Sequence, residues 1–440
     1  MKKAFSLCQI CMGAGTLLLC GALVYKSVLA PVVDAEAAAM LHDLKQQKQQ
    51  AQTIPGNFYD RNGIPLTESH LEGEEGTLLY PETTSLLIGY NNQRFGASGL
   101  RKTCADTLYL RGEDVSLTLD IHLQEYAYSL LPEDACAIVL ENTTGAILAL
   151  ASKSTVPFDA NHLEESLAAA NLEDGSLLVR GISEQDPPGS TMKILTTTAA
   201  LESERKSPGS ITFLYDDNTP LVVPGRTMTI HNFDNENWGQ LDLETAFTRS
   251  SNTYFANLVL QSGPDPLADL LERVGWGSPL PLDFCTLKSN IGDLSRPEEL
   301  VQTSFGQGEV TITPLQLAAT YAAYWNSDGA MMIPHLLSDT HPRVLCEAIA
   351  STSTLKKARS LLTAAAQKYG LTEETTRVTV GAKSGTAQCS GDRLHTWLVA
   401  GCDEGYTFLL SFSNGTSSAE LYEPMKELIS YTKALYPDGI

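Results

Sequence analysis

The stretch Pro187-Pro-Gly-Ser190-Thr-Met-Lys193-Ile-Leu-Thr-Thr-Thr-Ala-Ala-Leu201 joins a turn to a helix that carries a serine and a lysine. Pro and Gly favour a sharp turn, and the apolar run after Lys193 indicates a buried helix. Ser190 is then expected at the helix N-terminus, with Lys193 one turn further on the same face. A hydroxyl becomes a good nucleophile when a neighbouring amine, whose pKa burial lowers, takes its proton. We therefore take Ser190 as a candidate nucleophile and Lys193 as its candidate base.

The S-x-x-K spacing by itself is a weak signal, because the chain contains it two more times. Ser203-Glu-Arg-Lys206 lies at a charged helix end before Ser207-Pro208-Gly209. Ser353-Thr-Leu-Lys356 is typical of a helix start with an exposed lysine. We expect both copies to be structural.

Two later motifs strengthen the case for Ser190. Arg249-Ser250-Ser251-Asn252 follows an expected helix and supplies a hydroxyl and an amide two residues apart, although a helix cap would need the same residue types. Val380-Gly-Ala-Lys383-Ser384-Gly385-Thr386-Ala387 places a lysine, a small residue and a glycine on an expected strand. Such a glycine lets a substrate backbone approach closely, but it also fits an edge-strand bulge. In this order, S-x-x-K, S-x-N and K-S-G form the set found in class A β-lactamases and penicillin-binding proteins.

With these motifs, the sequence resembles the class B penicillin-binding proteins, which are monofunctional transpeptidases, over nearly the whole chain. Four further stretches carry the resemblance: Tyr59-Asp-Arg-Asn-Gly63, Leu117-Thr-Leu-Asp-Ile-His-Leu-Gln124, Gly306-Gln-Gly-Glu-Val-Thr-Ile-Thr-Pro-Leu-Gln316 and His395-Thr-Trp397. The chain departs from the family at Pro55-Gly56, where Arg-Gly is usual, and at Gly99-Leu100-Arg101, where Gly-Leu-Glu is usual. Both departures concern the packing and partner contacts of the family's N-terminal pedestal. The third motif has Ser384 in place of the commoner threonine, which keeps the hydroxyl.

The resemblance implies an α+β fold of the penicilloyl-serine transferase (β-lactamase/transpeptidase-like) type. This fold has a helical lobe and a five-stranded antiparallel sheet with helices on both faces. The resemblance adds a small N-terminal pedestal and one transmembrane helix.

The resemblance also implies roles for the motif residues. Ser190 attacks the carbonyl between the two terminal D-alanines of a peptidoglycan stem peptide, with Lys193 as general base. The backbone N–H groups of Ser190 and Thr386 form the oxyanion hole. Ser250 passes a proton to the departing D-alanine, in contact with Lys193 and Lys383, and Asn252 orients the peptide. The substrate carboxylate is expected on Lys383, Ser384 and Thr386, with Gly385 giving access to the strand. β-Lactams mimic the D-Ala-D-Ala end and acylate Ser190.

Other functions share these motifs. A DD-carboxypeptidase differs mainly in using water, not an amine, as the final acceptor. A serine β-lactamase needs a deacylating base, and no E-x-x-L-N element of the class A kind follows Ser250. A β-lactam-binding sensor would need several further membrane spans. An inactive scaffold of the cell-wall machinery should lack a motif residue, and all are present.

The N-terminus and the charge indicate where the chain works. The net charge of -22 argues against a nucleic-acid partner. Lys2 and Lys3 precede an apolar run from Ala4 to Tyr25, which as a helix would span about 33 Å, enough for a bilayer core. The basic residues favour a cytoplasmic N-terminus, so the body is expected outside. A cleaved signal peptide ending at Val28-Leu29-Ala30 is the alternative, and it exports the body too.

The sequence suggests three parts: residues 1–30 as cytoplasmic tip and membrane anchor, 31–130 as stalk and pedestal, and 131–440 as transpeptidase domain. The stalk includes the polar, helix-favouring tract Asp43-Leu-Lys-Gln-Gln-Lys-Gln-Gln50. Because no glycosyltransferase domain fits in residues 31–130, the resemblance suggests a polytopic membrane glycosyltransferase as partner. No cofactor is expected. No metal is expected either, because the eight histidines form no HExxH-like cluster and the cysteines have no metal-ligand spacing.

The strands of the expected domain lie near its two ends. Cys136–Glu141 and Gly145–Leu150 are apolar runs joined by Asn142-Thr-Thr144, which predicts a hairpin. Further strands are expected at 377–380, 396–400 and 406–410, helices from 191 to about 359, and an amphipathic helix over 419–435. This order predicts one mixed sheet that the two ends of the domain build together. The six cysteines outside the anchor are expected to be small buried or half-buried thiols.

Overall fold

The computed structural model describes residues 40, 45–46, 48–50, 52–170, 175–218, 220–389 and 393–437. These residues form two compact units. The smaller unit contains the described residues up to Gly56, with Ser69–Gly76 and Ala105–Glu113. The larger unit contains Asn57–Glu68, Thr77–Cys104 and the chain from Asp114 onward. All three sequence motifs lie in the larger unit.

The smaller unit is held by backbone and amide contacts around η2 (Asp106–Arg111), a single π-helical turn. Gly56 N donates to Leu108 O at 3.1 Å, and Gln49 Nε2 donates to Leu110 O at 2.8 Å. Of the tract that predicts a helical stalk, residues 45–46 and 48–50 are described and are helical. In the described ranges, no helix combines the length and the apolar character that a membrane crossing needs. The predicted anchor, Ala4 to Tyr25, lies outside these ranges.

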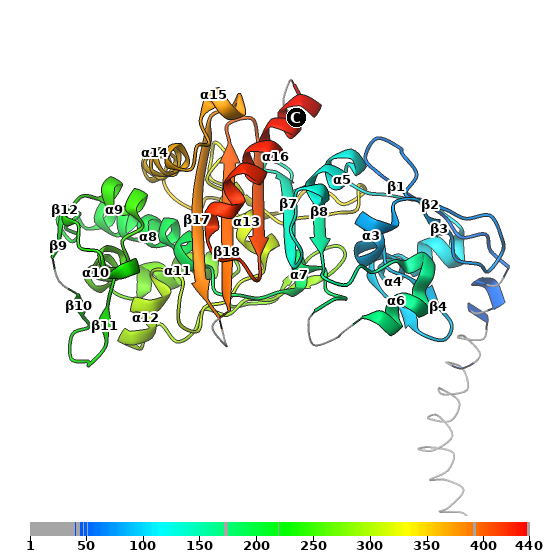
Figure 1. The fold of residues 1–440 in the computed structure, drawn as a ribbon, viewed down its shortest axis with the longest axis horizontal. Helices are drawn as coiled ribbons and strands as arrows, with labels where there is room; N and C mark the ends of the chain where they lie inside the picture. Colours follow the sequence, from blue (N-terminus) through cyan, green and yellow to red (C-terminus); the bar gives the residue numbers. More distant parts are fainter. Residues whose placement is uncertain are drawn as a thin grey trace, which may run out of the picture. The chain divides into compact units, whose positions relative to one another are not determined.

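A five-stranded sheet forms the centre of the larger unit (Figure 1). Its strands are, in spatial order, β17 (Val380–Gln388), β18 (Leu394–Cys402), β19 (Tyr406–Phe412), β7 (Ala135–Glu141) and β8 (Ile147–Lys153). The predicted hairpin is β7–β8, and the sheet joins the two ends of the domain as predicted. The expectation of a mixed sheet is wrong, because every pair in it is antiparallel.

The strands carry few polar residues because helices cover both faces of the sheet. Every residue of β7 is buried. Helix α16 (Tyr422–Leu435) packs on β18 and β19 in front of the sheet as drawn, and α13 (Pro314–Ala322) packs on β19 and β7 from behind (Figure 1). The predicted C-terminal helix therefore exists, preceded by the short η7 (Ser418–Leu421). The strand expected at 377–380 begins only at Val380, because Arg377 adopts a left-handed conformation with φ +64°.

The helical lobe surrounds α8 (Lys193–Lys206), whose residues from Lys193 to Ala200 are all buried. The helices that pack directly on α8 are α10 (Asn252–Ser262), α11 (Asp265–Arg273) and α14 (Thr352–Lys368). Their neighbours are α9 (Leu243–Arg249), which packs on α14, and α12 (Pro297–Thr303), which packs on α10. This environment explains why the helix is uncharged from Ile194 to Leu201, whereas its last turn, outside the packed part, is charged.

The N-terminal part of the larger unit consists of short elements. Strand β1 (Phe58–Tyr59) pairs in parallel with β6 (Val115–Ser116). The predicted turn after Tyr59 is present, since the Asp60 carboxylate accepts from the N–H groups of Asn62 and Ile64 at 2.8 Å each. The other helices there are α3 (Pro81–Ile88), α4 (Gly99–Thr103) and α5 (Ile121–Ser129), and the other strands are β2 (Thr67–Glu68), β3 (Thr77–Leu78), β4 (Asn91–Asn92) and β5 (Gly96–Ala97).

Short elements also connect the sheet to the helices. They are η3 (Ala160–His162), α6 (Leu163–Ala169), α7 (Arg180–Ser183), η4 (Gly189–Met192), β9 (Tyr215–Asp217), β10 (Leu221–Val222), β11 (Thr229–Ile230), η5 (Phe233–Asn235), β12 (Gly239–Leu241), β13 (Leu280–Pro281), β14 (Thr286–Leu287), β15 (Met331–Met332), β16 (Val344–Cys346) and α15 (Glu373–Thr376). The cysteines behave as expected: Cys104, Cys136, Cys346 and Cys402 are buried free thiols, and Cys285 and Cys389 are half-buried ones.

Candidate active site

Ser190 lies in η4, a 3-10 turn that leads directly into α8. The sequence predicts a helix N-terminus at this point, and the first turn is a 3-10 turn instead of an α-helical one. Gly189 begins the turn with φ +55°, a conformation that favours glycine. The Thr191 hydroxyl closes the turn by donating to Pro188 O at 2.7 Å. Ser190 is half-buried, so part of this residue remains accessible to solvent.

Lys193, the first residue of α8, is completely buried and reaches the second motif. Its Nζ lies 2.6 Å from Ser250 O, 3.1 Å from Ser250 Oγ and 2.8 Å from Asn252 Oδ1. Within the described ranges, none of its hydrogen bonds goes to Ser190. The structure therefore brings the first and second motifs together through the lysine.

The second motif occupies the break between α9 and α10. Ser250 has φ +62° and ends α9 in a left-handed conformation, which is uncommon for a residue with a Cβ. Ser251 then caps α10, its hydroxyl accepting from Tyr254 N at 3.1 Å. The helix cap that sequence reasoning kept as an alternative is thus present, at Ser251. The side chains of the neighbouring Ser250 and Asn252 contact Lys193 Nζ instead of capping the helix.

Lys383 of β17 approaches the same hydroxyl from the sheet. Its Nζ lies 3.1 Å from Ser250 Oγ and 2.9 Å from Ser384 O, and the lysine is 1% exposed. Ser250 Oγ therefore has an amine on each side, one from α8 and one from β17. Tyr369 OH lies 3.5 Å from Lys383 Nζ, and nothing in the motif spacing pointed to this tyrosine.

Burial disfavours positive charge on both amines, and the neighbouring Lys383 also disfavours it on Lys193. Burial, with a further contribution from Lys383, holds the pKa of Lys193 well below its usual range. Burial lowers the pKa of Lys383 to about 7. Their surroundings are partly aromatic: Lys193 Nζ lies 5.6 Å from the ring centroid of Phe255 and Lys383 Nζ lies 5.8 Å from that of Phe247. An aromatic face attracts the charged amine, but burial outweighs this attraction and favours the neutral amine, which is the form that can accept a proton.

The third motif lies on β17, at the edge of the sheet, next to the turn Gly189–Met192 that carries Ser190, which we call the nucleophile turn. A Cβ placed on Gly385 would lie 2.9 Å from Pro188 O and 3.3 Å from Ser190 N. A Cβ on Gly189 would in turn lie 3.0 Å from Thr386 O. The two backbones are in direct contact there, so Gly385 is needed for close approach to the turn itself. Ser384 is half-buried and Thr386 is exposed, on the same edge strand.

Two residues that sequence reasoning did not single out support the motifs. Gly306 has φ +78°, its carbonyl accepts from Gly189 N at 2.9 Å, and a Cβ on it would lie 2.0 Å from Gly189 O. Asn232 Oδ1 accepts from Ser251 Oγ at 3.1 Å and from Asn252 N at 2.7 Å. Gly306 was visible in the sequence only as part of a family-like stretch, and Asn232 carried no signal at all.

The other two S-x-x-K copies are structural, as expected. Ser203 to Lys206 forms the last turn of α8, and Lys206 is exposed. Ser353 to Lys356 lies in the first turn of α14, where Lys356 is exposed. Neither lysine is buried next to a hydroxyl in the way Lys193 is.

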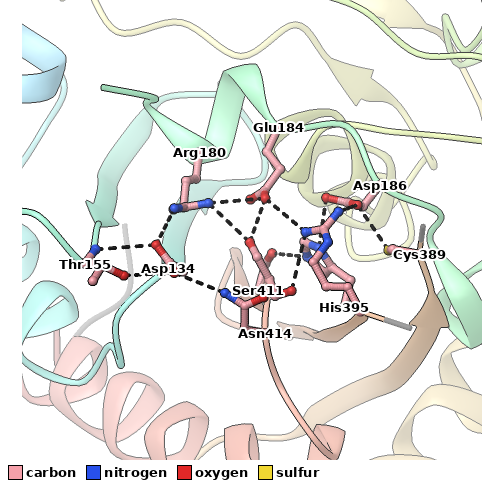
Figure 2. A network of polar contacts seen from close by, with 11 residues as sticks. Asp134, Thr155, Arg180, Glu184, Asp186, Cys389, His395, Ser411 and Asn414 are labelled. Atoms are coloured by element: carbon pink, nitrogen blue, oxygen red, sulfur yellow. Dashed lines mark hydrogen bonds and ion pairs between the residues drawn. The ribbon is translucent and has the colours of Figure 1, made fainter. Parts of the chain in front are cut away.

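A polar network borders the nucleophile turn on the side of the β17–β18 connection (Figure 2). Within the described residues, one group of potential metal ligands occurs, and it lies in this network: Glu184, Asp186 and His395 place one ligand atom each within 4.8 Å of one another. Arg393 lies 2.6 Å from Asp186 Oδ1 and 3.7 Å from Glu184 Oε1. The carboxylates therefore already lie against a guanidinium and an imidazole ring.

Comparison with known proteins gives consistent results. Residues 135–414 match the family described as penicillin binding protein transpeptidase domain. The chain is 31% identical to the peptidoglycan D,D-transpeptidase PbpA of Mycolicibacterium smegmatis over 76% of this chain and 73% of that one. It is 30% identical to PbpA of Mycobacterium tuberculosis over 66% of this chain and 64% of that one.

Solved structures agree on the fold. The ceftriaxone acyl-enzyme complex of penicillin-binding protein A from M. tuberculosis aligns with a TM-score of 0.76 and 22% identity. The alignment covers 88% of this chain and all of the other, 100%. At this level of identity the likeness establishes the shared fold, including the sheet and the helical lobe.

Proposed function

Because the chain belongs to the class B penicillin-binding proteins, we propose that it is a peptidoglycan D,D-transpeptidase that cross-links stem peptides through an acyl-enzyme on Ser190. The observation that carries this assignment is the position of Ser250 Oγ, 3.1 Å from Lys193 Nζ and 3.1 Å from Lys383 Nζ. A hydroxyl between two amines of lowered pKa is equipped to pass protons in both directions.

Acylation begins at Ser190. Its Oγ forms a bond to the carbonyl carbon between the two terminal D-alanines, and the hydroxyl proton goes to the neutral amine of Lys193. The peptide C–N bond then breaks. The departing D-alanine nitrogen takes the proton through Ser250, which touches Lys193 directly. The amine is therefore neutral again when the acyl-enzyme is complete.

The negative oxygen of the tetrahedral intermediate is stabilised by the backbone N–H groups of Ser190 and Thr386. Each such donor typically contributes about 2.7–4 kcal/mol to the transition state. The contact between the nucleophile turn and β17 at Gly385 supports this role, since it brings the two segments together. Lys383, Ser384 and Thr386 hold the terminal carboxylate, and Asn252 orients the peptide.

The second half-reaction reverses these steps with a different amine. An amino group of a neighbouring stem peptide attacks the ester carbon, and its proton passes through Ser250 to Lys193. The ester C–O bond then breaks, and Lys193 returns this proton to Ser190 Oγ. β-Lactams acylate Ser190 in the same way, because their strained amide resembles the D-Ala-D-Ala end. No metal or cofactor takes part in these steps.

The N-terminal part places this chemistry outside the cell membrane. Residues 1–30 form the cytoplasmic tip and a single transmembrane anchor, 31–130 a stalk and pedestal, and 131–440 the transpeptidase domain. The apolar run from Ala4 to Tyr25 and the preceding lysines support this topology. A polytopic membrane glycosyltransferase supplies the glycan strands that are cross-linked.

Covalent labelling with fluorescent penicillin tests the assignment. The wild-type chain should form one penicilloyl adduct, and Ser190→Ala should form none. Ser203→Ala and Ser353→Ala are matched controls, because each removes a serine with the same S-x-x-K spacing. Both controls should label normally. Labelling that persists in Ser190→Ala would exclude Ser190 as the nucleophile.

A further inference from the structure

Asp186, four residues before Ser190, links the nucleophile turn to the β17–β18 connection (Figure 2). Its Oδ1 lies 2.6 Å from Arg393 and accepts from the Cys389 thiol at 3.2 Å. Its Oδ2 lies 2.9 Å from His395 Nδ1. Cys389 follows β17, Arg393 precedes β18 and His395 belongs to β18. One carboxylate from the segment before Ser190 therefore contacts both ends of the β17–β18 connection and strand β18 itself, in the hairpin that carries the third motif.

The next residue of the nucleophile segment makes a second link to the same hairpin. Trp397 Nε1 donates to Pro187 O at 2.9 Å. The indole also stacks on His395, with ring centroids 4.2 Å apart. Because both residues are almost fully buried, the two links form one packed unit. We call Asp186, His395 and Trp397 the turn clamp.

The register of the sheet connects this clamp to the third motif. His395 is the cross-strand partner of Ala387, and Trp397 is the partner of Gly385. These pairs flank Thr386, whose own partner is Thr396. The clamp residues on β18 thus lie on either side of the backbone N–H that completes the oxyanion hole. Moving them relative to the nucleophile turn would move Thr386 relative to Ser190.

The Asp186 carboxylate is buried between the Arg393 guanidinium and the His395 ring. Burial alone would raise the pKa of Asp186, but its neighbours His395 and Arg393 outweigh burial and lower it to about 2. On the other side, His395 Nε2 lies 2.6 Å from Ser411 Oγ, which fixes the ring orientation. Glu184 completes the charge pattern next to Arg393. Hydrogen bonds to an ionised group are the stronger kind, so this link is well suited to hold a geometry.

We propose that Asp186 and His395, with Trp397, are positioning residues for catalysis: they clamp the nucleophile turn to β17 so that the N–H groups of Ser190 and Thr386 point at the same oxygen. The clamp touches no reacting atom and acts through the alignment of these two donors. This inference rests on the proposed function, since an oxyanion hole matters only if Ser190 is acylated. Removing an oxyanion donor costs about 10²–10³-fold in rate, and a misplacement of about 1 Å about 10²-fold.

The test compares two Asp→Asn changes in the same polar network, in the detergent-solubilised full chain. Asp186→Asn removes the charge that contacts the β17–β18 hairpin. Asp134→Asn is the matched control: its carboxylate pairs with Arg180 and contacts Thr155 and Asn414, and within the described chain these partners lie outside the β17–β18 hairpin (Figure 2). Its backbone has φ +58°, which asparagine tolerates well.

Two quantities are measured with a penicillin labelled with ¹³C at the β-lactam carbonyl: the acylation rate and the infrared band of the resulting ester carbonyl. We expect Asp186→Asn to slow acylation about 10- to 100-fold. We also expect the ester band to shift to higher wavenumber, because weaker hydrogen bonds in the oxyanion hole polarise the carbonyl less. Asp134→Asn should match the wild type in both. A merely stabilising role for Asp186 would leave the band in place.

Trp397→Phe provides a second route if Asp186→Asn does not fold. It keeps an aromatic ring next to His395 and removes the indole N–H that binds Pro187 O together with part of the buried ring, so a smaller shift in the same direction is expected. An unshifted band with wild-type acylation in the folded variant would overturn the proposal. Equal effects of Asp186→Asn and Asp134→Asn would also overturn it. If the wild-type chain forms no acyl-enzyme, the proposed function itself fails, and that result is distinct from both.

Discussion

Replacing Gly306 with alanine should disable the nucleophile turn from a residue outside all three motifs. Gly306 has φ +78°, and a Cβ there would lie 2.0 Å from Gly189 O, 2.5 Å from Gly189 N and 2.6 Å from Gly189 C. All three atoms belong to the backbone, so no side chain can rotate out of the way. One of the two segments has to move.

The size of the effect follows from these distances. The left-handed backbone alone costs an L-residue about 1–2 kcal/mol. Restoring ordinary contact requires a displacement of the order of 1 Å or more, and such a displacement at a catalytic group costs about 10²-fold in rate. The hydrogen bond from Gly189 N to Gly306 O, 2.9 Å, would be disturbed as well. We therefore expect acylation by penicillin to slow at least about 100-fold.

Gly209→Ala is the matched control, because Gly209 has φ +84° and no atom within 4 Å of the Cβ position. Alanine at position 209 has the same unfavourable left-handed backbone, but its Cβ meets no other atom. Stopped-flow acylation with fluorescent penicillin, together with thermal unfolding by circular dichroism, separates the two contributions. Gly209→Ala should lower the unfolding temperature and acylate normally. Wild-type acylation in Gly306→Ala, or equal slowing in both variants, would refute the reasoning.

Three further outcomes can be checked directly. The acylation rate should increase as pH rises through the lowered pKa of Lys193, because the neutral amine is the base. Lys193→Arg should be nearly inactive, because a guanidinium does not deprotonate. Wild-type acylation by the Lys193→Arg chain would contradict the role of Lys193 as base. The unfolding temperature should fall as pH drops from about 4.5 to about 2. The reason is that Asp186 and Glu202 have pKa values of about 2 in the folded state, against 3.8 and 4.5 in the unfolded state, so their contribution to stability is present above this pH window and lost below it. An unfolding temperature that does not change over this window would contradict the argument. With a D-Ala-D-Ala thioester analogue, added D-amino acids should divert product from hydrolysis to aminolysis, whereas amine-independent hydrolysis, by product analysis, would favour a carboxypeptidase or β-lactamase.

The motif residues could be predicted from the sequence because each is marked by local chemistry. A serine and a lysine three apart before an apolar run predict a buried lysine one turn after the serine. The structure shows Lys193 buried and places Lys193 and Lys383 on the same Ser250 hydroxyl. The residues that contact these motif residues belong to no recognisable local sequence pattern. Asn232 lies twenty residues before Asn252 and Asp186 more than two hundred before Arg393, so only the fold brings them together.

Strand direction could not be derived from the residues either. Strands β7 and β19 are buried on both faces, and so lack the alternation of polar and apolar residues that marks a half-exposed antiparallel sheet. The resemblance to the family supplied the antiparallel order that the pattern could not. At the start of β17 the local pattern failed for a different reason. Arg377 has an unremarkable sequence context, yet it ends α15 with a left-handed backbone and delays the strand to Val380.

The contacts of the Ser250 hydroxyl explain why the second motif has a serine at that position in spite of its left-handed backbone. With φ +62° and ψ +42°, the residue turns its carbonyl and its hydroxyl toward the same amine, at 2.6 Å and 3.1 Å from Lys193 Nζ. A glycine would adopt this conformation at no cost but would lack the hydroxyl that Lys383 also contacts. Serine keeps the hydroxyl at a cost of about 1–2 kcal/mol. The caps that Asp242 gives α9 and Ser251 gives α10 hold both flanking helices, so the break between them can stay strained.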